Sequence, residues 1–162
     1  GVSSSGVSTA ATVRRREALF TLGTTVVAVA PAARASVAEP TASAIGKAVD
    51  PGVARKILQI ERLNVDSNVN GDPKKHLPQV AVADAKVTCT VPHVMDPAKP
   101  HFIEYLWLKD EATETIIAAK QFKATDPAPP SLVAPSVKRG TTVVPVAYCN
   151  LHGLWIGDAE LV

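Results

Sequence analysis

The pair Cys149 and His152 is the first feature of the sequence that could do chemistry. It directly follows the apolar run 143–148, which has the length of a β-strand. A thiolate and an imidazole three residues apart on a tight turn can face one point, and Gly153 lets the backbone come close. The spacing therefore indicates metal binding, although a Cys-x-x-His pair by itself is a weak signal.

The three remaining histidines lie upstream in two segments. His76 stands in the run Lys-Lys-His-Leu-Pro at 74–78, and His93 and His101 lie eight residues apart before the apolar run 102–109. Imidazole nitrogen and thiolate sulfur are both ligands that transition metals accept. All four histidines of the chain thus lie in the part of the sequence where a metal site is suspected.

The two cysteines allow two interpretations. In an exported protein, Cys89 and Cys149 would most simply form a disulfide. In the other interpretation Cys149 is a metal ligand, and Cys89 is a small buried hydrophobe on its strand.

Length and charge narrow the class of protein. A chain of 162 residues has room for one domain with a proper core. Four of the 17 basic residues and one of the 15 acidic residues precede Ser36, so the remainder is close to neutral. Because this body has no basic aromatic stripe, we exclude nucleic-acid binding.

The elements that must position the candidate ligands are short strands. From residue 77 onward, apolar runs of strand length are separated by Pro, Gly and Asp. Residues 53–63 could form a helix or a lead-in strand. Short strands without long helices predict an immunoglobulin-like β-sandwich of about seven strands, which we expect at 80–84, 86–91, 102–109, 115–122, 131–137, 141–148 and 154–161.

The first 35 residues have the composition of a targeting segment. Arginines at 14–16 precede the uncharged run 18–33, and Ala-Arg-Ala at 33–35 offers a cleavage site. The paired arginines resemble a twin-arginine export signal, and the Ser- and Thr-rich start resembles the end of a plastid transit peptide. A thylakoid lumen and a bacterial periplasm are the two expected locations.

The remaining domain boundaries follow from composition. We expect a targeting segment at 1–35, a linker at 36–56 and the functional domain at 57–162. The alternative for residues 14–35 is membrane association. Sixteen helical residues would span only about 24 Å of a hydrocarbon core of about 30 Å, so a permanent span is marginal.

Three motifs in this order resemble one protein family. They are Lys-His-Leu-Pro at 75–78, a His-to-His loop running into His-Phe-Ile-Glu-Tyr at 101–105, and Cys-Asn-Leu-His-Gly-Leu-Trp at 149–155. Together they resemble the iron domain of superoxide reductases, the neelaredoxin and desulfoferrodoxin group, over roughly residues 72–157. No Cys-x-x-Cys cluster precedes the domain, so a second, rubredoxin-like iron centre is not expected.

The resemblance implies one mononuclear iron that reduces superoxide to hydrogen peroxide, with electrons from an unidentified one-electron donor protein. The implied arrangement has Cys149 on the axis opposite an open position, and four histidines in a plane: His76, His93, His101 and His152. Lys75 matches the family lysine. It is the candidate catalytic residue, expected to attract superoxide and to orient a water for protonation.

Two departures from the family pattern bear on activity. Lys74 stands where the family usually has a glutamate, and the loop between His93 and His101 is longer than usual. These departures keep open an accessory subunit of a membrane complex with little catalysis. A copper electron-transfer protein is a further alternative, and the sequence also leaves a homo-oligomer open.

Overall fold

The computed structural model describes residues 49–162. The expected targeting segment, its cleavage site and most of the expected linker lie outside the described residues. Within the described part, no helix is long and apolar enough to cross a membrane.

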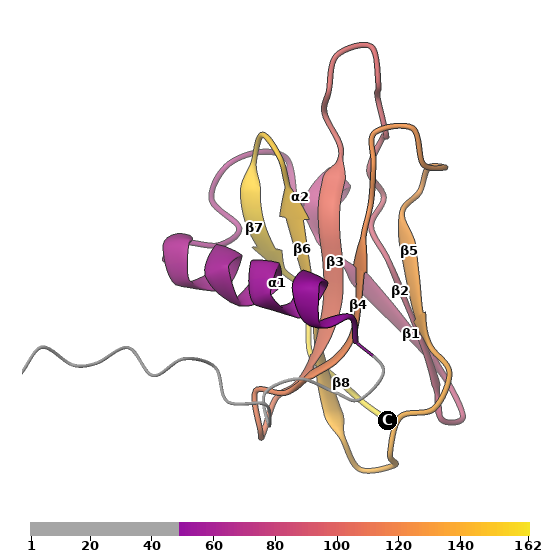
Figure 1. Cartoon of the computed structure of the whole chain (residues 1–162). Helices are drawn as coiled ribbons and strands as arrows, with labels where there is room; N and C mark the ends of the chain where they lie inside the picture. The colour runs from indigo at the N-terminus through magenta and orange to yellow at the C-terminus, as the bar shows by residue number, and fades with distance from the viewer. Residues whose placement is uncertain (1–48) are drawn as a thin grey trace, which may run out of the picture. The chain divides into compact units, whose positions relative to one another are not determined.

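Two antiparallel sheets form a sandwich (Figure 1). The smaller sheet has the order β1-β2-β5, and the larger has the order β4-β3-β6-β7 with β8 pairing with β6. The predicted immunoglobulin-like sandwich is confirmed. The strands are β1 (Gln79–Ala83), β2 (Lys86–Thr90), β3 (Ile103–Asp110), β4 (Ile116–Gln121), β5 (Ser131–Ala134), β6 (Thr142–Cys149), β7 (Gly153–Ile156) and β8 (Glu160–Leu161).

The last expected strand, 154–161, is divided into β7 and β8. Gly157 lies at the division, and a Cβ built there would stand 2.1 Å from the carbonyl oxygen of Pro78. The N–H of Gly157 still donates to the carbonyl oxygen of Pro145 on β6 at 3.0 Å, so a glycine is needed here for the close approach of the segment that follows His76.

Strand β3 is buried on both faces, as its continuous apolar run predicts. Leu106 and Leu108 belong to the core between the two sheets. Tyr105 and Trp107 point to the opposite face, where helix α1 (Pro51–Leu63) covers them. The second buried face is thus produced by a helix rather than by a third sheet.

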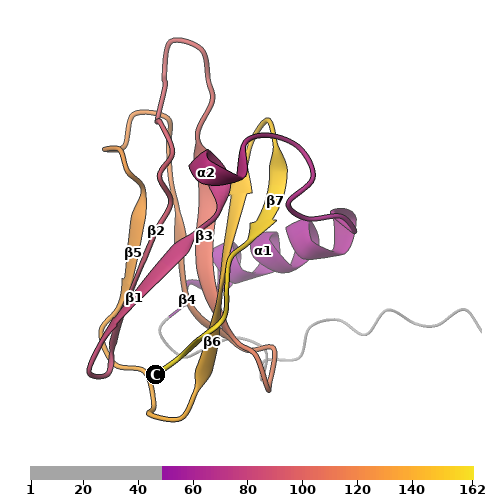
Figure 2. The ribbon, with the colours of Figure 1, turned by 180° about the vertical axis from the view of Figure 1, so that it is seen from behind.

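Helix α1 resolves the ambiguity left by residues 53–63. Asp50 caps it, accepting hydrogen bonds from the N–H groups of Gly52 and Val53 at 2.8 and 2.9 Å, and Pro51 occupies the first turn. The fully buried Ala54 and Ile57 pack on the larger sheet, across which α1 lies in Figures 1 and 2. The helix begins within the range 36–56 expected to be a linker.

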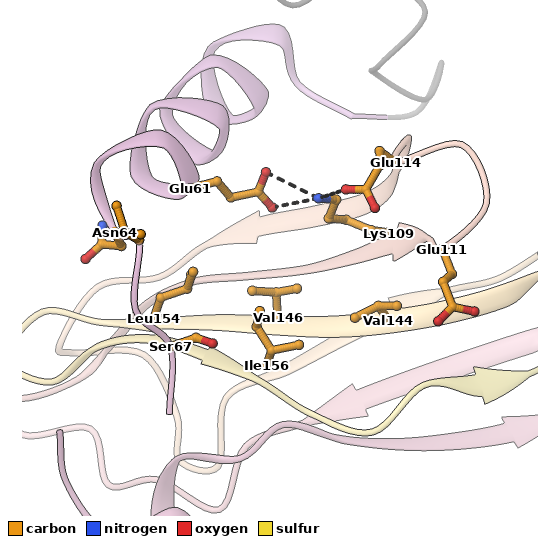
Figure 3. A pocket seen from close by; sticks show the side chains of 11 residues that line it. Glu61, Asn64, Ser67, Lys109, Glu111, Glu114, Val144, Val146, Leu154 and Ile156 are labelled. Carbon is orange, nitrogen blue, oxygen red and sulfur yellow. Dashed lines mark hydrogen bonds and ion pairs between the residues drawn. The ribbon is translucent and has the colours of Figure 1, made fainter. Parts of the chain in front are cut away.

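Glu61 fixes the end of α1 to the sheet. Its carboxylate accepts a hydrogen bond from Trp107 Nε1 at 3.0 Å and pairs with Lys109 Nζ at 3.2 Å, and Glu114 lies on the other side of Lys109 (Figure 3). A cavity of about 310 Å³ opens beside this group, with Val146 among its lining residues. None of the five candidate ligands lines that cavity.

Candidate metal centre

The four histidine rings form a closed ring of neighbours. His93 Nε2 lies 3.2 Å from His76 Nε2 and 3.1 Å from His101 Nε2. His152 Nδ1 closes the figure, at 3.1 Å from His101 Nε2 and 2.8 Å from His76 Nε2. Neighbouring rings meet at steep angles of 67–88°, whereas the facing pair His76 and His101 has centroids 6.1 Å apart.

Cys149 adds a sulfur to this quadrilateral. Its Sγ lies 3.8 Å from His93 Nε2 and 3.6 Å from His152 Nδ1, and all five donor atoms lie within 4.8 Å of one another. Cys149 is fully buried in the core between the sheets, whereas His101 and His152 are half-buried. The structure therefore brings together all five residues named from the sequence, with the sulfur supplied by a core residue.

A one-turn helix that the sequence did not predict positions His76. This helix, α2 (Pro73–His76), is capped by Asp72, whose carboxylate accepts from the N–H of Lys74 at 3.0 Å. His76 Nδ1 donates to the carbonyl oxygen of Asp72 at 2.8 Å, which leaves Nε2 as the free lone pair. The indole of Trp155 stacks on the His76 ring, with centroids 4.8 Å apart and planes 20° apart.

The long loop between His93 and His101 is closed by a β-bridge. The N–H of Asp96 donates to the carbonyl oxygen of His101 at 3.2 Å, and the reverse bond measures 3.3 Å. The extra residues of the loop form a turn between these two positions. His93 Nδ1 donates to the carbonyl oxygen of Val94, so its Nε2 also faces the site. The added length therefore leaves both histidines in reach of the other donors.

Asn150 joins the Cys-x-x-His turn to this loop. Its Oδ1 accepts from the N–H of Phe102 and its Nδ2 donates to the carbonyl oxygen of Pro100, both at 2.9 Å. These two residues flank His101, so one amide side chain holds the backbone on each side of that ligand. This role of Asn150 is not predicted from the sequence, although its position between Cys149 and His152 is a signal that could have indicated it.

The electrostatics of the site favour a metal over protons. Burial lowers the pKa of His93 to about 4 and also lowers the pKa of His76 and of His101. Burial raises the pKa of the Cys149 thiol, and the N–H groups of Leu151 and His152 partly offset that rise. At neutral pH these three imidazoles are therefore uncharged, which is the form that binds metal.

Cys89 lies apart from this group. Both cysteines are free thiols, so the disulfide interpretation is not realised. Cys89 is fully buried in strand β2, and burial raises its pKa to about 12, as befits a small apolar core residue.

Lys74 and Lys75 are both exposed on α2, directly before His76. The positive charge of Lys75 adds to burial in lowering the pKa of His76 and of His101, which places the ammonium group near the ligands. Its catalytic role stays a prediction.

A family model described as desulfoferrodoxin matches residues 68–158, more than half of the chain. The chain belongs to the desulfoferrodoxin family. The match includes α2 and every strand from β1 to β7, whereas α1 precedes it. Helix α1 is thus an addition to the part of the chain that defines the family.

Solved structures of superoxide reductases align with this desulfoferrodoxin-family chain. The enzyme from Treponema pallidum is 26% identical, with 57% of this chain and 74% of that chain covered and a TM-score of 0.47. The one-iron enzyme from Giardia intestinalis is 19% identical, covering 55% and 99%, with a TM-score of 0.43. The enzyme from Nanoarchaeum equitans is 22% identical, covering 60% and 100%, with a TM-score of 0.43. Among curated proteins no relative matches.

The donor set fits the iron that the family resemblance implies. Bonds of about 2.1 Å in a square arrangement separate neighbouring nitrogens by about 3.0 Å, and the four nitrogen separations here are 2.8–3.2 Å. Tetrahedral zinc takes four ligands. A blue-copper centre takes two histidines, a cysteine and a weak axial methionine, whereas Met95 packs against the hydrophobic core. Four imidazoles with one thiolate suit an iron of higher coordination number.

Proposed function

We propose that this chain reduces superoxide to hydrogen peroxide at one mononuclear iron held by four histidines and Cys149. The observation that carries the proposal is the closed quadrilateral of histidine nitrogens with the Cys149 sulfur beside it, all within 4.8 Å. Superoxide takes up one electron and two protons to become hydrogen peroxide, so the site needs an electron donor, an open edge and access to water.

When bound, the iron supplies the single electron. The chain's own residues prepare the site for this. His76 and His93 are held by hydrogen bonds to backbone carbonyls, so their donor nitrogens do not have to reorganise. The N–H groups of Leu151 and His152 face the Cys149 sulfur and stabilise its thiolate form.

On the exposed side of the site, superoxide enters and protons are delivered. His101 and His152 are half-buried, so this edge is open to water, which delivers the protons. The exposed Lys75 raises the local concentration of a small anion and can orient a water molecule beside it. The reaction requires no organic cofactor in addition to the iron.

The experiment pairs two cysteine substitutions. Cys149→Ser should abolish the thiolate-to-iron charge-transfer band and slow the reaction with superoxide, because it removes the only sulfur of the donor set. Cys89→Ser is the matched control, since Cys89 is equally buried in the same core but lies outside the group of five donor atoms. An unchanged spectrum in Cys149→Ser would refute the ligand assignment. Bound iron without turnover in the wild type would instead favour an accessory subunit.

For the compartment, we propose export to a thylakoid lumen or a bacterial periplasm, supported by the arginines at 14–16 and the uncharged run that follows. Replacing the three arginines by lysines should leave the protein on the near side of the membrane. Normal export of that variant would refute the signal. The electron donor is proposed to be a separate one-electron carrier protein.

A further inference from the structure

The segment 64–72 links α1 to α2 and rises beside β7, as seen in Figure 2. We call this segment the arch. It makes a parallel bridge to the sheet between Ser67 and Leu154. The arch therefore connects a helix that precedes the family match with the helix that carries the first histidine.

Asn68 anchors the arch on β7. Its backbone N–H donates to the carbonyl oxygen of Leu154 at 2.9 Å. Its side-chain Nδ2 donates to the carbonyl oxygen of Ile156 at 2.8 Å, and its Oδ1 accepts from the Ile156 N–H at 2.7 Å. The side-chain amide thus satisfies both backbone groups of Ile156 on the edge of β7 that no strand within residues 49–162 covers.

Three residues further on, the backbone of the arch passes close to the rings of two candidate ligands. A Cβ built on Gly71 would lie 3.2 Å from His76 Cε1 and 3.3 Å from His152 Cγ. Gly71 also has a φ of +126°, a conformation that other residues rarely adopt. The backbone conformation favours a glycine here, and a Cβ would push against both rings, which would have to move by a few tenths of an ångström.

These two rings form the shortest side of the quadrilateral, with His76 Nε2 and His152 Nδ1 2.8 Å apart. His76 belongs to α2 and His152 to the turn before β7, so no single element fixes both. The arch is in contact with both elements at once, through Asn68 on β7 and Gly71 on the rings.

We propose that the arch is a positioning element of the iron site, in which Gly71 sets the orientation of the His76 and His152 rings and Asn68 holds Gly71 in place. The inference rests on the proposed iron centre. Contacts that orient metal ligands without touching the metal typically change affinity 10- to 100-fold. Loss of the arch contact should therefore speed the release of iron.

The experiment compares three variants: two replace a glycine by alanine, and one replaces Asn68 by glycine. Gly71→Ala inserts a methyl group against both rings. Gly140→Ala is the matched control, because Gly140 also has a positive φ, of +84°, but its Cβ would meet nothing within 4 Å. Asn68→Gly tolerates the φ of 61° at this position and removes only the side-chain bonds to Ile156.

Each protein is loaded anaerobically with Fe(II), and loss of iron to an excess of chelator is followed by absorption. Gly71→Ala and Asn68→Gly should release iron about ten-fold faster than the wild type or more. After oxidation of a second sample to Fe(III), the thiolate-to-iron charge-transfer band should be shifted in Gly71→Ala. Gly140→Ala should release iron at the wild-type rate. Wild-type release and spectra in both arch variants would overturn the proposal, and Asn68→Gly decides alone if Gly71→Ala does not fold.

The NMR signals of the histidine rings in metal-free protein separate this inference from the proposed function. We expect the His76 and His152 signals to shift in Gly71→Ala and to stay in place in Gly140→Ala. Unshifted signals would overturn the arch contact whatever metal the protein binds. A wild-type protein that takes up no iron, with these shifts present, would contradict the proposed function and not the contact.

Discussion

The buried histidines should make the metal-free protein sensitive to acid. Burial lowers the pKa of His93 from its usual 6.5 to about 4 in the folded protein. Between about pH 4 and pH 6.5, the His93 imidazole is therefore protonated in the unfolded chain but not in the folded chain. Unfolding free energy is highest above pH 6.5, falls as the pH drops, and stops falling near pH 4, where the folded protein also takes up the proton.

The size of the effect follows from the same two pKa values. One pKa unit corresponds to about 1.4 kcal/mol. When the pH falls from 7.5 to 5.0, protonation of His93 alone should therefore lower the unfolding free energy by about 2 kcal/mol. Burial lowers the pKa of His76 and of His101 as well, which adds to the loss in the same direction. Urea unfolding followed by the fluorescence of the buried Trp107 and Trp155 measures the total.

His93→Gln is the variant that isolates the effect. It removes the titrating group, so the difference in unfolding free energy between pH 7.5 and pH 5.0 should shrink by about 2 kcal/mol, whatever its cost at neutral pH. An equal difference in wild type and variant would refute the buried, uncharged state of His93. In iron-loaded protein the same protons compete with the metal, so acid should release iron.

Three further predictions concern other contacts. Gly157→Ala places a Cβ 2.1 Å from the carbonyl oxygen of Pro78, so it should lower the unfolding free energy by about 1–3 kcal/mol, and wild-type stability in urea would contradict the contact. Glu61→Ala removes the acceptor of the buried Trp107 N–H and should lower the unfolding free energy by about 1–3 kcal/mol. Glu61→Gln keeps an acceptor and should restore most of this free energy. Equal losses of stability in the two variants would refute the hydrogen bond. Lys75→Glu should slow the reaction with superoxide about ten-fold or more at low salt and less at high salt, and equal rate constants by pulse radiolysis would show that Lys75 does not attract the anion.

Much of the sandwich could be predicted because its strands are short apolar runs bounded by turn residues. Residues 53–63 stayed ambiguous because apolar residues alone do not separate a buried strand from a helix. In the structure, Asp50 as the N-cap and Pro51 in the first turn stabilise the helix over the strand. Helix α2 has only four residues, which is too short to show a helical period.

The grouping of the five candidate ligands could be predicted from the order of the motifs and their family resemblance, but the geometry of the group could not. His152 presents Nδ1 whereas His76, His93 and His101 present Nε2. For His152 this choice depends on the turn that carries it, and for His76 and His93 on hydrogen bonds from Nδ1 to the carbonyl oxygens of Asp72 and Val94. Gly71 was missed because the sequence of the arch does not reveal that its backbone lies against two rings.

The most direct test of the central claim is the product balance when reduced, iron-loaded protein meets a limiting amount of superoxide. A reductase converts each superoxide to one molecule of hydrogen peroxide, oxidises one iron and releases no dioxygen, and this is the result we predict. Release of dioxygen, with only one molecule of peroxide for every two of superoxide, would indicate dismutation. Iron that stays fully reduced, with no peroxide formed by the protein, would indicate no catalysis. Either result would contradict the account.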